Sequence, residues 1–269
     1  MDCKVVSFIN MKGGVGKTTL VINLAHTLMK EENKRVLIVD MDPQFNATQA
    51  LFTKYKSIKE YEKLINRKTI CAILHSDDRS IIEGGKKTTV EDIIINLENN
   101  ESGKLDIIPG DLNLTSFESS DRGSEKLLNR NINKIKEGYD YILIDTPATY
   151  SVYGQASLLA SDYYVVPVLP DTFASLGYDL LESKVENDIV LEDMKPVKLG
   201  VIITLSNQNK AKRKAISESF EEIKFKNELH ENENIRSGNF DNFIYDMLST
   251  KDNIKKIAKE FIKKIEEVN

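Results

Sequence analysis

The sequence predicts an α/β fold, in which a doubly wound, mainly parallel sheet is flanked by helices on both faces. Two observations carry this prediction. Near-continuous apolar runs rich in β-branched residues recur along the 269-residue chain, as in parallel strands that are buried on both sides. Amphipathic helical patterns lie between most of these runs, and this alternation covers both faces of a parallel sheet. The length suits a single domain over residues 1–269 with a large core.

Strands are expected in six segments, at residues 4–9, 35–39, 105–108, 141–144, 163–168 and 199–204. A helix is expected to begin near Lys17, because Leu20, Leu24 and Leu28 recur at helical spacing after it. At the other end, residues 252–267 place apolar side chains on one helical stripe with lysines around it. Most helices of this kind pack on their own domain.

Residues 54–103 are the least regular part of the chain and are rich in lysine, aspartate and asparagine. We expect a helical excursion from the sheet there, with short helices around 57–66, 69–75 and 89–97. The glycines and lysines at 84–87 predict an exposed turn. The excursion is a candidate surface for partner contacts.

The composition is that of an ordinary water-soluble protein, with 41% hydrophobic and 29% charged residues. No apolar stretch approaches the ~18 residues of a membrane span. Asp2 and an immediate short strand at the N-terminus do not fit a signal peptide, so we expect a cytoplasmic protein. The net charge of −5 argues against a uniformly basic nucleic-acid binder but leaves local basic patches open.

A glycine-rich loop follows the first predicted strand and carries the chemistry. It reads Lys12-Gly13-Gly14-Val15-Gly16-Lys17-Thr18-Thr19. Its glycines let backbone N–H groups pack against phosphate oxygens without a Cβ in the way. Lys17 would neutralise the β- and γ-phosphates, Thr18 would offer its hydroxyl to Mg²⁺, and the following helix would direct its positive end to the same anion. The usual pattern has glycine where this chain has Met11, and Lys12 is an additional cation.

Carboxylates stand at the ends of two other predicted strands. Asp40 and Asp42 follow the second strand, and Asp145 ends the fourth, before Pro147. The carboxyl ends of parallel strands meet at the edge where ligands bind in such sheets. These acids could hold Mg²⁺ or orient the water that attacks a phosphate, with Asp145 in the Walker B position. For any single aspartate, a helix cap or a solvated loop is the alternative.

Together these motifs resemble the ParA/MinD group of deviant Walker ATPases, a SIMIBI-class family of P-loop NTPases. The resemblance is strongest to the ParA branch that acts in plasmid and chromosome partition, and it extends over nearly the whole chain. The segments that carry it are residues 12–19, 39–44 with 46–48, 108–114, 144–147 and 166–168.

The resemblance implies an ATP-dependent switch in which two protomers sandwich two ATP molecules. Lys12 would reach the partner's phosphates, and Asp42 would orient the attacking water. The implied catalytic residues are Lys12, Lys17 and Asp42. The implied metal residues are Thr18, Asp40 and Asp145. The implied ATP-binding residues are Lys12, Gly13, Gly14, Val15, Gly16, Lys17, Thr18, Thr19 and, for adenine, Asn207, although an asparagine in a loop is more often a turn residue.

The resemblance also implies that the ATP-bound homodimer binds DNA nonspecifically on the nucleoid, and that a centromere-bound adaptor protein stimulates hydrolysis. Candidate phosphate contacts are Lys210, Lys212, Arg213, Lys214 and Arg236. A solvated helix start is the alternative for this charge run. Where many relatives carry a second cation before Asn-Ile-Arg, this chain has Glu233. Because the chain begins at its first strand, no N-terminal helix-turn-helix is expected.

Three other functions were weighed. A MinD-like ATPase would bind membranes through the C-terminal helix, which has six lysines between 251 and 264. Acidic residues dilute that charge, so the sequence favours DNA over membrane. An electron-transfer or metal-insertion ATPase would need cysteines placed to hold a cluster, and Cys3 and Cys71 are not so placed. A binding scaffold without hydrolysis conflicts with the complete set of Lys12, Lys17, Thr18 and Asp42.

Overall fold

The structure is a computed structural model. It describes residues 2–65, 67–74, 82–83, 86–101, 103–119, 123–206, 211–231 and 243–268. For residues 82–83, 86–87, 119 and 211–213 it describes the backbone alone.

Eight strands of the described chain form one sheet, in the order β10-β9-β8-β1-β7-β2-β6-β5. All six predicted strands are present in it. The pairs are parallel except for β5 and β6, which run antiparallel at one edge. The bounds are β1 Lys4–Phe8, β2 Arg35–Asp40, β5 Ile95–Asn99, β6 Lys104–Ile108, β7 Tyr141–Asp145, β8 Tyr163–Val168, β9 Val197–Ser206 and β10 Leu229–His230. A separate antiparallel pair joins β3 Ile82–Glu83 to β4 Lys86–Lys87.

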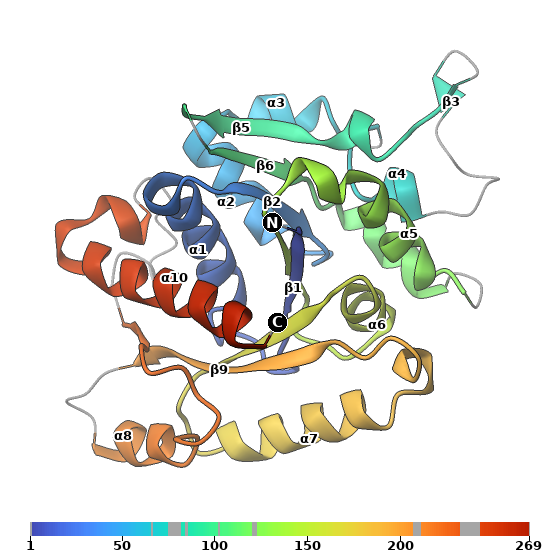
Figure 1. The fold of residues 1–269 in the computed structure, drawn as a ribbon. Coiled ribbons are helices and arrows are strands. Elements are labelled where there is room, and N and C mark those ends of the chain that lie inside the picture. The colour runs from blue at the N-terminus through green and yellow to red at the C-terminus, as the bar shows by residue number, and fades with distance from the viewer. Residues whose placement is uncertain are drawn as a thin grey trace.

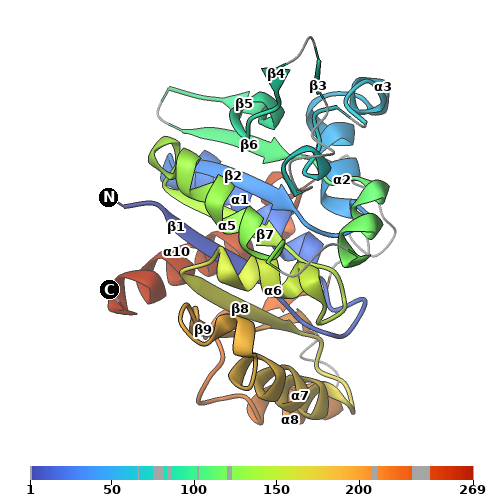
Figure 2. The same ribbon diagram turned by 90° about the vertical axis from the view of Figure 1, so that its right-hand side faces the viewer.

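Helices cover both faces of the sheet (Figures 1 and 2). On one face lie α1 Lys17–Glu32, α2 Asn46–Tyr55 and α10 Leu248–Val268. On the other lie α4 Cys71–Leu74, α5 Lys126–Ile135, α6 Val152–Leu159, α7 Ala174–Glu186 and α8 Ala211–Glu218. In the described part of the chain, the remaining α-helix is α3 Ile58–Glu62, and the 3₁₀ segments are η1 Glu91–Ile93, η2 Leu112–Ser119, η3 Lys136–Gly138, η4 Ile189–Leu191 and η5 Ile244–Asp246.

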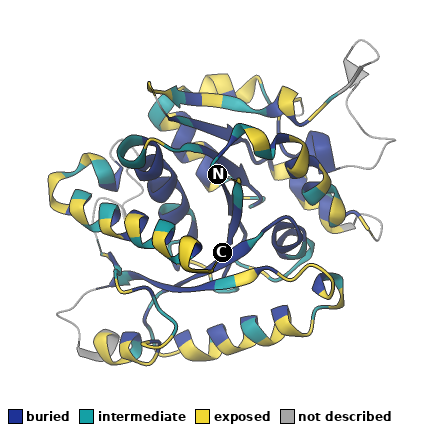
Figure 3. Cartoon of the chain, in the orientation of Figure 1, coloured by how far each residue is buried: buried dark blue, intermediate teal, exposed yellow. Residues whose placement is uncertain are grey.

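The alternation of side chains along each strand divides the core between the two faces. In β2, Val36 and Ile38 join the core under α1, whereas Leu37 and Val39 join the core under α5 and α6. The central strands are therefore buried on both sides, and the helices carry exposed residues on their outer surfaces (Figure 3). This is the predicted doubly wound, mainly parallel architecture.

Parallel strands bring the predicted functional segments to one edge of the sheet. Phe8 pairs with Asp145 in register, and Asp40 pairs with the same aspartate from the other side. The ends of β1, β7 and β2 thus stand side by side, and the glycine-rich loop follows β1. The fold therefore assembles one site from segments far apart in sequence.

The C-terminal helix α10 packs its apolar stripe on its own domain, as predicted. Five residues of the stripe are buried: Ile254, Ile257, Ala258, Phe261 and Ile265. The ring of Phe261 stacks on Phe8, with centroids 6.3 Å apart, and lies 5.7 Å from the ring of Tyr141. Among the described residues, no helix is long and apolar enough to cross a membrane.

The helical excursion differs from its prediction. The first two short helices exist as α3 and α4, which are shorter than the segments expected at 57–66 and 69–75. The helix predicted at 89–97 is wrong, because η1 there gives way to strand β5. The half-buried Ile95, the exposed Asn96 and the buried Leu97 alternate with period two, and β5 pairs with the outer edge of β6. The glycines of the predicted turn, at 84–85, lie outside the described residues.

Candidate nucleotide-binding site

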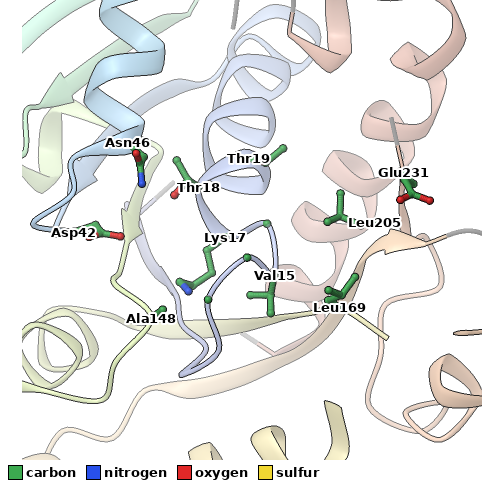
Figure 4. Close-up of a pocket in the computed structure, with 13 residues that line it drawn as sticks. Val15, Lys17, Thr18, Thr19, Asp42, Asn46, Ala148, Leu169, Leu205 and Glu231 are labelled. Atoms are coloured by element: carbon green, nitrogen blue, oxygen red, sulfur yellow. The ribbon is translucent and has the colours of Figure 1, made fainter. Parts of the chain in front are cut away.

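A pocket of about 570 Å³ opens at the carboxyl edge of the sheet, around the glycine-rich loop. Figure 4 shows Lys17 and Thr18 at its centre, with Asp42 on one side and Leu205 on the other. The pocket is lined by Gly13, Gly14, Val15, Gly16, Lys17, Thr18, Thr19, Asp42, Asn46, Ala148, Leu169, Leu205 and Glu231.

The loop needs its glycines for different reasons. Gly14 and Gly16 have φ angles of +70° and +79°, in the left-handed region that favours glycine. Gly13 is not among the described residues with positive φ, and a Cβ there would meet no atom closer than 3.8 Å. Because Gly13 has no side chain, the pocket beside its backbone stays open. A phosphate can therefore approach the backbone N–H there. Val15 is buried, and its carbonyl accepts a hydrogen bond from Thr204.

Lys17 begins α1 and is buried beneath the loop, with 7% of its surface exposed. Its ammonium donates hydrogen bonds to the carbonyl oxygens of Asn10, at 3.1 Å, and Lys12, at 3.3 Å. Burial lowers the pKa of Lys17, and the nearby carboxylates of Asp145 and Asp42 oppose that shift. A buried ammonium at a helix N-terminus is a site for an anion.

Thr18 and Asp145 form a pair below the loop, in which Asp145 is fully buried and Thr18 is half-buried. The Thr18 hydroxyl donates a 2.7 Å hydrogen bond to Asp145 Oδ2, whereas Oδ1 of the same carboxyl is buried without a hydrogen-bond partner. Burial raises the pKa of Asp145 well above its usual value, and the charge of Asp40 adds to the shift. A buried oxygen without a partner fits a divalent cation.

No group of three or more histidine, cysteine, aspartate or glutamate side chains that could hold a metal is found among the described residues. A cation at Thr18 and Asp145 would therefore take its other ligands from phosphates and water, which is the usual mode for Mg²⁺.

Asp40 ends β2 and is also fully buried, but both of its oxygens have protein partners. Oδ2 accepts hydrogen bonds from the Thr48 backbone N–H, at 2.9 Å, and from the Thr48 hydroxyl, at 2.7 Å. Oδ1 accepts a 3.2 Å hydrogen bond from the Asp42 N–H. Burial raises the pKa of Asp40 to about 7, although the bonds from Thr48 favour the charged form.

Asp42 lies at the rim of the pocket, half-buried, in the turn before α2. Its Oδ1 accepts a 2.9 Å hydrogen bond from the Gln44 N–H, and its carbonyl accepts one of 2.8 Å from Phe45. These bonds fix the turn and leave the carboxylate facing the pocket (Figure 4). The carboxylate of Asp42 can therefore accept a hydrogen bond from a water molecule above the loop.

The side chain of Lys12 forms an ion pair with Asp171, just before α7. About a third of each side chain is exposed, at 32% for Lys12 and 36% for Asp171. The same aspartate accepts a 3.1 Å hydrogen bond from the Phe173 N–H. The two lysines of one loop thus have different environments.

Several residues in or beside the pocket were not predicted from the sequence. Asn10 fixes the start of the loop: its Nδ2 donates to the Pro167 carbonyl at 2.7 Å, and its Oδ1 accepts from the Lys12 N–H at 2.9 Å. Asn46 lines the pocket beside Asp42, and its place in the second motif could have revealed it. Leu205 gave no signal in the sequence and has a left-handed φ of +51°.

The predicted adenine contact Asn207 lies outside the described residues. Leu205, two positions before it, lines the pocket with Leu169 and Glu231, opposite Asp42 (Figure 4). This end of the pocket is more apolar than the end around Asp42 and suits a flat heterocycle.

The predicted DNA contacts are only partly described. Lys210 and Arg236 lie outside the described residues, and the side chains of Lys212 and Arg213 in α8 do as well. Lys214 is exposed on α8, and its ammonium lies 3.9 Å from Glu218, one turn along the helix. An exposed ion pair of this kind contributes little to stability.

Comparisons with known proteins identify the family of this chain. The family model described as "AAA domain" matches residues 3–195. The chain is 32% identical to the sporulation initiation inhibitor protein Soj of Bacillus subtilis, over 75% of this chain and 72% of that protein. It is 30% identical to the chromosome partitioning protein ParA of Myxococcus xanthus, over 75% of this chain and 65% of that protein.

A solved structure is similar over nearly the full length of this chain. It is that of a plasmid partition protein from Borrelia burgdorferi B31 bound to AMPPNP. The TM-score is 0.77 at 28% identity, covering 98% of this chain and 100% of the other. The same fold therefore holds an ATP analogue in that protein.

Proposed function

The chain belongs to the ParA family of partition ATPases, and on that premise we propose that it hydrolyses ATP with Mg²⁺ as a homodimer that partitions DNA. The observation that carries the proposal is the buried carboxyl of Asp145, which accepts from Thr18 on Oδ2 and has no hydrogen-bond partner on Oδ1, beside a glycine-rich loop. A triphosphate and its metal are the ligands that these groups suit together.

Thr18 and Asp145 would hold Mg²⁺, which neutralises phosphate charge when it is bound. The N–H groups of residues 13–18 would bind the phosphate oxygens, and Lys17 would exchange its two carbonyl partners for them. The adenine would lie toward Leu205. The γ-phosphate would then lie toward the side of the pocket that carries Asp42.

Asp42 would orient the attacking water, because its carboxylate lies at the rim of the pocket while its backbone is fixed by the turn. Lys12 would leave Asp171 and reach the phosphates of a second protomer. A cation supplied in trans is worth about 10³-fold or more in the rate of phosphoryl transfer. Hydrolysis would therefore require the dimer, and the dimer would dissociate after hydrolysis.

In its ATP-bound form the dimer would bind nucleoid DNA without sequence preference, through α8 and its neighbours, and a centromere-binding adaptor would stimulate hydrolysis. Support comes from the partition proteins among the relatives and from the basic sequence at 210–214. Membrane attachment through α10, the alternative, has less support because the apolar stripe of that helix is already buried in the core.

Three variants separate the steps of the proposed cycle. Lys17→Ala should abolish binding of a fluorescent ATP analogue. Lys12→Ala should keep that binding but lose ATP-dependent dimerisation in light scattering. Asp42→Ala should bind ATP and dimerise without releasing phosphate. Normal turnover by Asp42→Ala, or normal dimerisation by Lys12→Ala, would contradict the assigned roles.

DNA binding is tested separately by charge reversal in α8. The double variant Lys212→Glu with Arg213→Glu should weaken binding to any DNA sequence and flatten its salt dependence. An unchanged DNA titration would move the binding surface elsewhere on the dimer.

A further inference from the structure

The loop after β6 contains a motif, residues 108–114, that the pocket itself does not explain. Gly110 lies in it, and the Gly110 N–H donates a 2.8 Å hydrogen bond to Thr48 Oγ1 on α2. The Thr48 hydroxyl donates in turn to Asp40 Oδ2 at 2.7 Å. Asp40 Oδ1 accepts from the Asp42 N–H at 3.2 Å. An unbroken series of hydrogen bonds thus connects the β6 loop to Asp42.

Gly110 must be glycine because its neighbours approach too closely for a side chain. A Cβ there would lie 2.9 Å from Asp40 Cγ and 3.0 Å from Phe45 Cβ. The backbone of Gly110 is not among the described positive-φ positions, so close approach and not backbone conformation explains the glycine. Gly110 therefore packs directly on the carboxyl of Asp40.

Tyr61 of α3, in the helical excursion, contacts both Gly110 and Phe45. Its buried hydroxyl donates a 2.9 Å hydrogen bond to the Gly110 carbonyl, and its ring stacks on Phe45 with centroids 5.5 Å apart. Phe45 has a left-handed φ of +42°, an unusual conformation for a bulky residue, and its N–H donates to the Asp42 carbonyl. Surrounding contacts must hold such a conformation in place.

We propose that Thr48, Gly110 and Tyr61, together the Asp42 clamp, are positioning residues that hold Asp42 in its hydrolytic geometry. The inference rests on the proposed function, in which Asp42 orients the attacking water. None of the three residues lines the nucleotide pocket. They act through Asp40 and Phe45, which bond to the backbone of Asp42 on either side of its side chain. The clamp also connects the excursion to the hydrolytic side of the site.

Thr48→Val tests the clamp because valine keeps the shape of threonine and removes both hydrogen bonds of the hydroxyl. We expect kcat to fall about tenfold or more, because a small displacement of a reacting group costs that much. The Kd for ATP and the ATP-dependent dimerisation should stay at wild-type values. Thr48→Ser retains the hydroxyl and should restore kcat. Thr53→Val, at an exposed position of the same helix, is the matched control and should leave kcat unchanged.

Gly110→Ala should lower kcat more than Thr48→Val does, because the added methyl displaces Asp40 and Phe45. Gly177→Ala is its control, since a Cβ at Gly177 meets nothing within 4 Å. Tyr61→Phe keeps the ring stacking, loses one hydrogen bond, and should lower kcat by about two- to fivefold. Circular dichroism and thermal melts verify that each variant is folded.

The outcomes separate this inference from the proposed function. If wild-type protein releases no phosphate from ATP, the proposed function fails. If wild-type protein is active and Thr48→Val retains its kcat, the clamp is overturned and the ATPase assignment stands. A loss of ATP affinity in Thr48→Val as large as its loss of kcat also overturns the clamp, because the residue would then support the whole pocket.

Discussion

Two neighbouring strands, β2 and β7, end in aspartates that look equivalent and are not. Asp40 and Asp145 are paired in register, both are fully buried, and burial raises the pKa of both. The carboxyl of Asp40 has hydrogen-bond partners on both oxygens, from Thr48 and Asp42. That of Asp145 has Thr18 on one oxygen and no partner on the other.

The difference shows how neighbours assign roles to identical side chains. A buried carboxyl with its oxygens satisfied holds the turn around it, whereas one with a free buried oxygen is prepared for a ligand. Both aspartates were predicted from the sequence as metal residues. We propose instead that Asp145 is a direct ligand and that Asp40 is a positioning residue, and the following experiments test that distinction.

The largest effect is expected from Asp145→Asn. The amide oxygen can still accept the Thr18 hydroxyl, but the charge facing the free position is lost. We expect phosphate release to fall about 100-fold or more and the Mg²⁺ requirement to rise. Both are measured by ATPase assays across a Mg²⁺ titration.

Asp106→Asn is the matched control for that variant. Asp106 is a buried strand aspartate whose oxygens accept from Tyr139 and Asn96, away from the pocket. The Asp106→Asn variant should leave turnover and the Mg²⁺ requirement unchanged. If Asp145→Asn also behaves like wild type, the free oxygen has no role in metal binding.

His26 extends the comparison, because its Nε2 is another buried atom without a hydrogen-bond partner. Burial lowers the pKa of His26 from 6.5 to about 4, while the nearby Asp246 opposes the shift. Glu98, Lys30 and Lys54 also face it. As the pH falls, His26 is therefore protonated in the unfolded chain at a higher pH than in the folded protein. Stability should be full above pH 6.5 and should decrease toward pH 4 by about 3 kcal/mol, at 1.36 kcal/mol per pH unit.

Urea denaturation between pH 7 and 4 measures this slope. His26→Leu should remove its share of the slope, whatever its effect on stability at pH 7. The control His230→Leu, at an exposed position of β10, should keep the wild-type slope. Equal slopes for wild type and His26→Leu would mean that His26 does not drive the pH dependence.

Asp40→Asn should have a smaller effect on turnover than Asp145→Asn, and of a different kind. One amide oxygen cannot replace two carboxyl oxygens, so the bond to Thr48 or to Asp42 is lost, at about 1–3 kcal/mol of stability. We expect kcat to fall about tenfold through displacement of Asp42. The Mg²⁺ requirement should stay unchanged. If it rises as much as in Asp145→Asn, Asp40 is a metal ligand and the distinction between the strand ends is wrong.

The smallest effect is expected at the Lys12–Asp171 ion pair. Asp171→Asn frees Lys12 from a partly exposed pair worth about 0.5–1 kcal/mol, so ATP-dependent dimers should form at about two- to fivefold lower protein concentration. Light scattering measures this midpoint in an Asp42→Ala background, which we expect to prevent hydrolysis. Glu182→Gln removes a comparable pair with Lys198 and should not shift it. An unchanged midpoint in Asp171→Asn would mean that the pair does not restrain Lys12.

The local pattern of apolar residues was sufficient to predict much of the fold. The six apolar runs became strands, and the helix beginning at Lys17 and the apolar stripe of α10 are present as predicted, because burial imposes its period directly on the sequence. The region 89–97 was mispredicted because a short run such as Ile93-Ile94-Ile95 satisfies helix and strand alike. The free edge of β6 decided in favour of a strand.

By itself, the sequence determined six strands of the sheet, the helix that begins at Lys17, the C-terminal helix, the phosphate loop and the acids at the strand ends, since each is written in contiguous residues. Only the tertiary structure decided which partner each polar group has. Lys12 meets Asp171 across 159 positions, and Gly110 meets Thr48 across 62. Such pairings depend on how distant segments pack, and hydrogen bonds are satisfied by proximity in space. For that reason two aspartates alike in sequence differ in the number of free oxygens they offer.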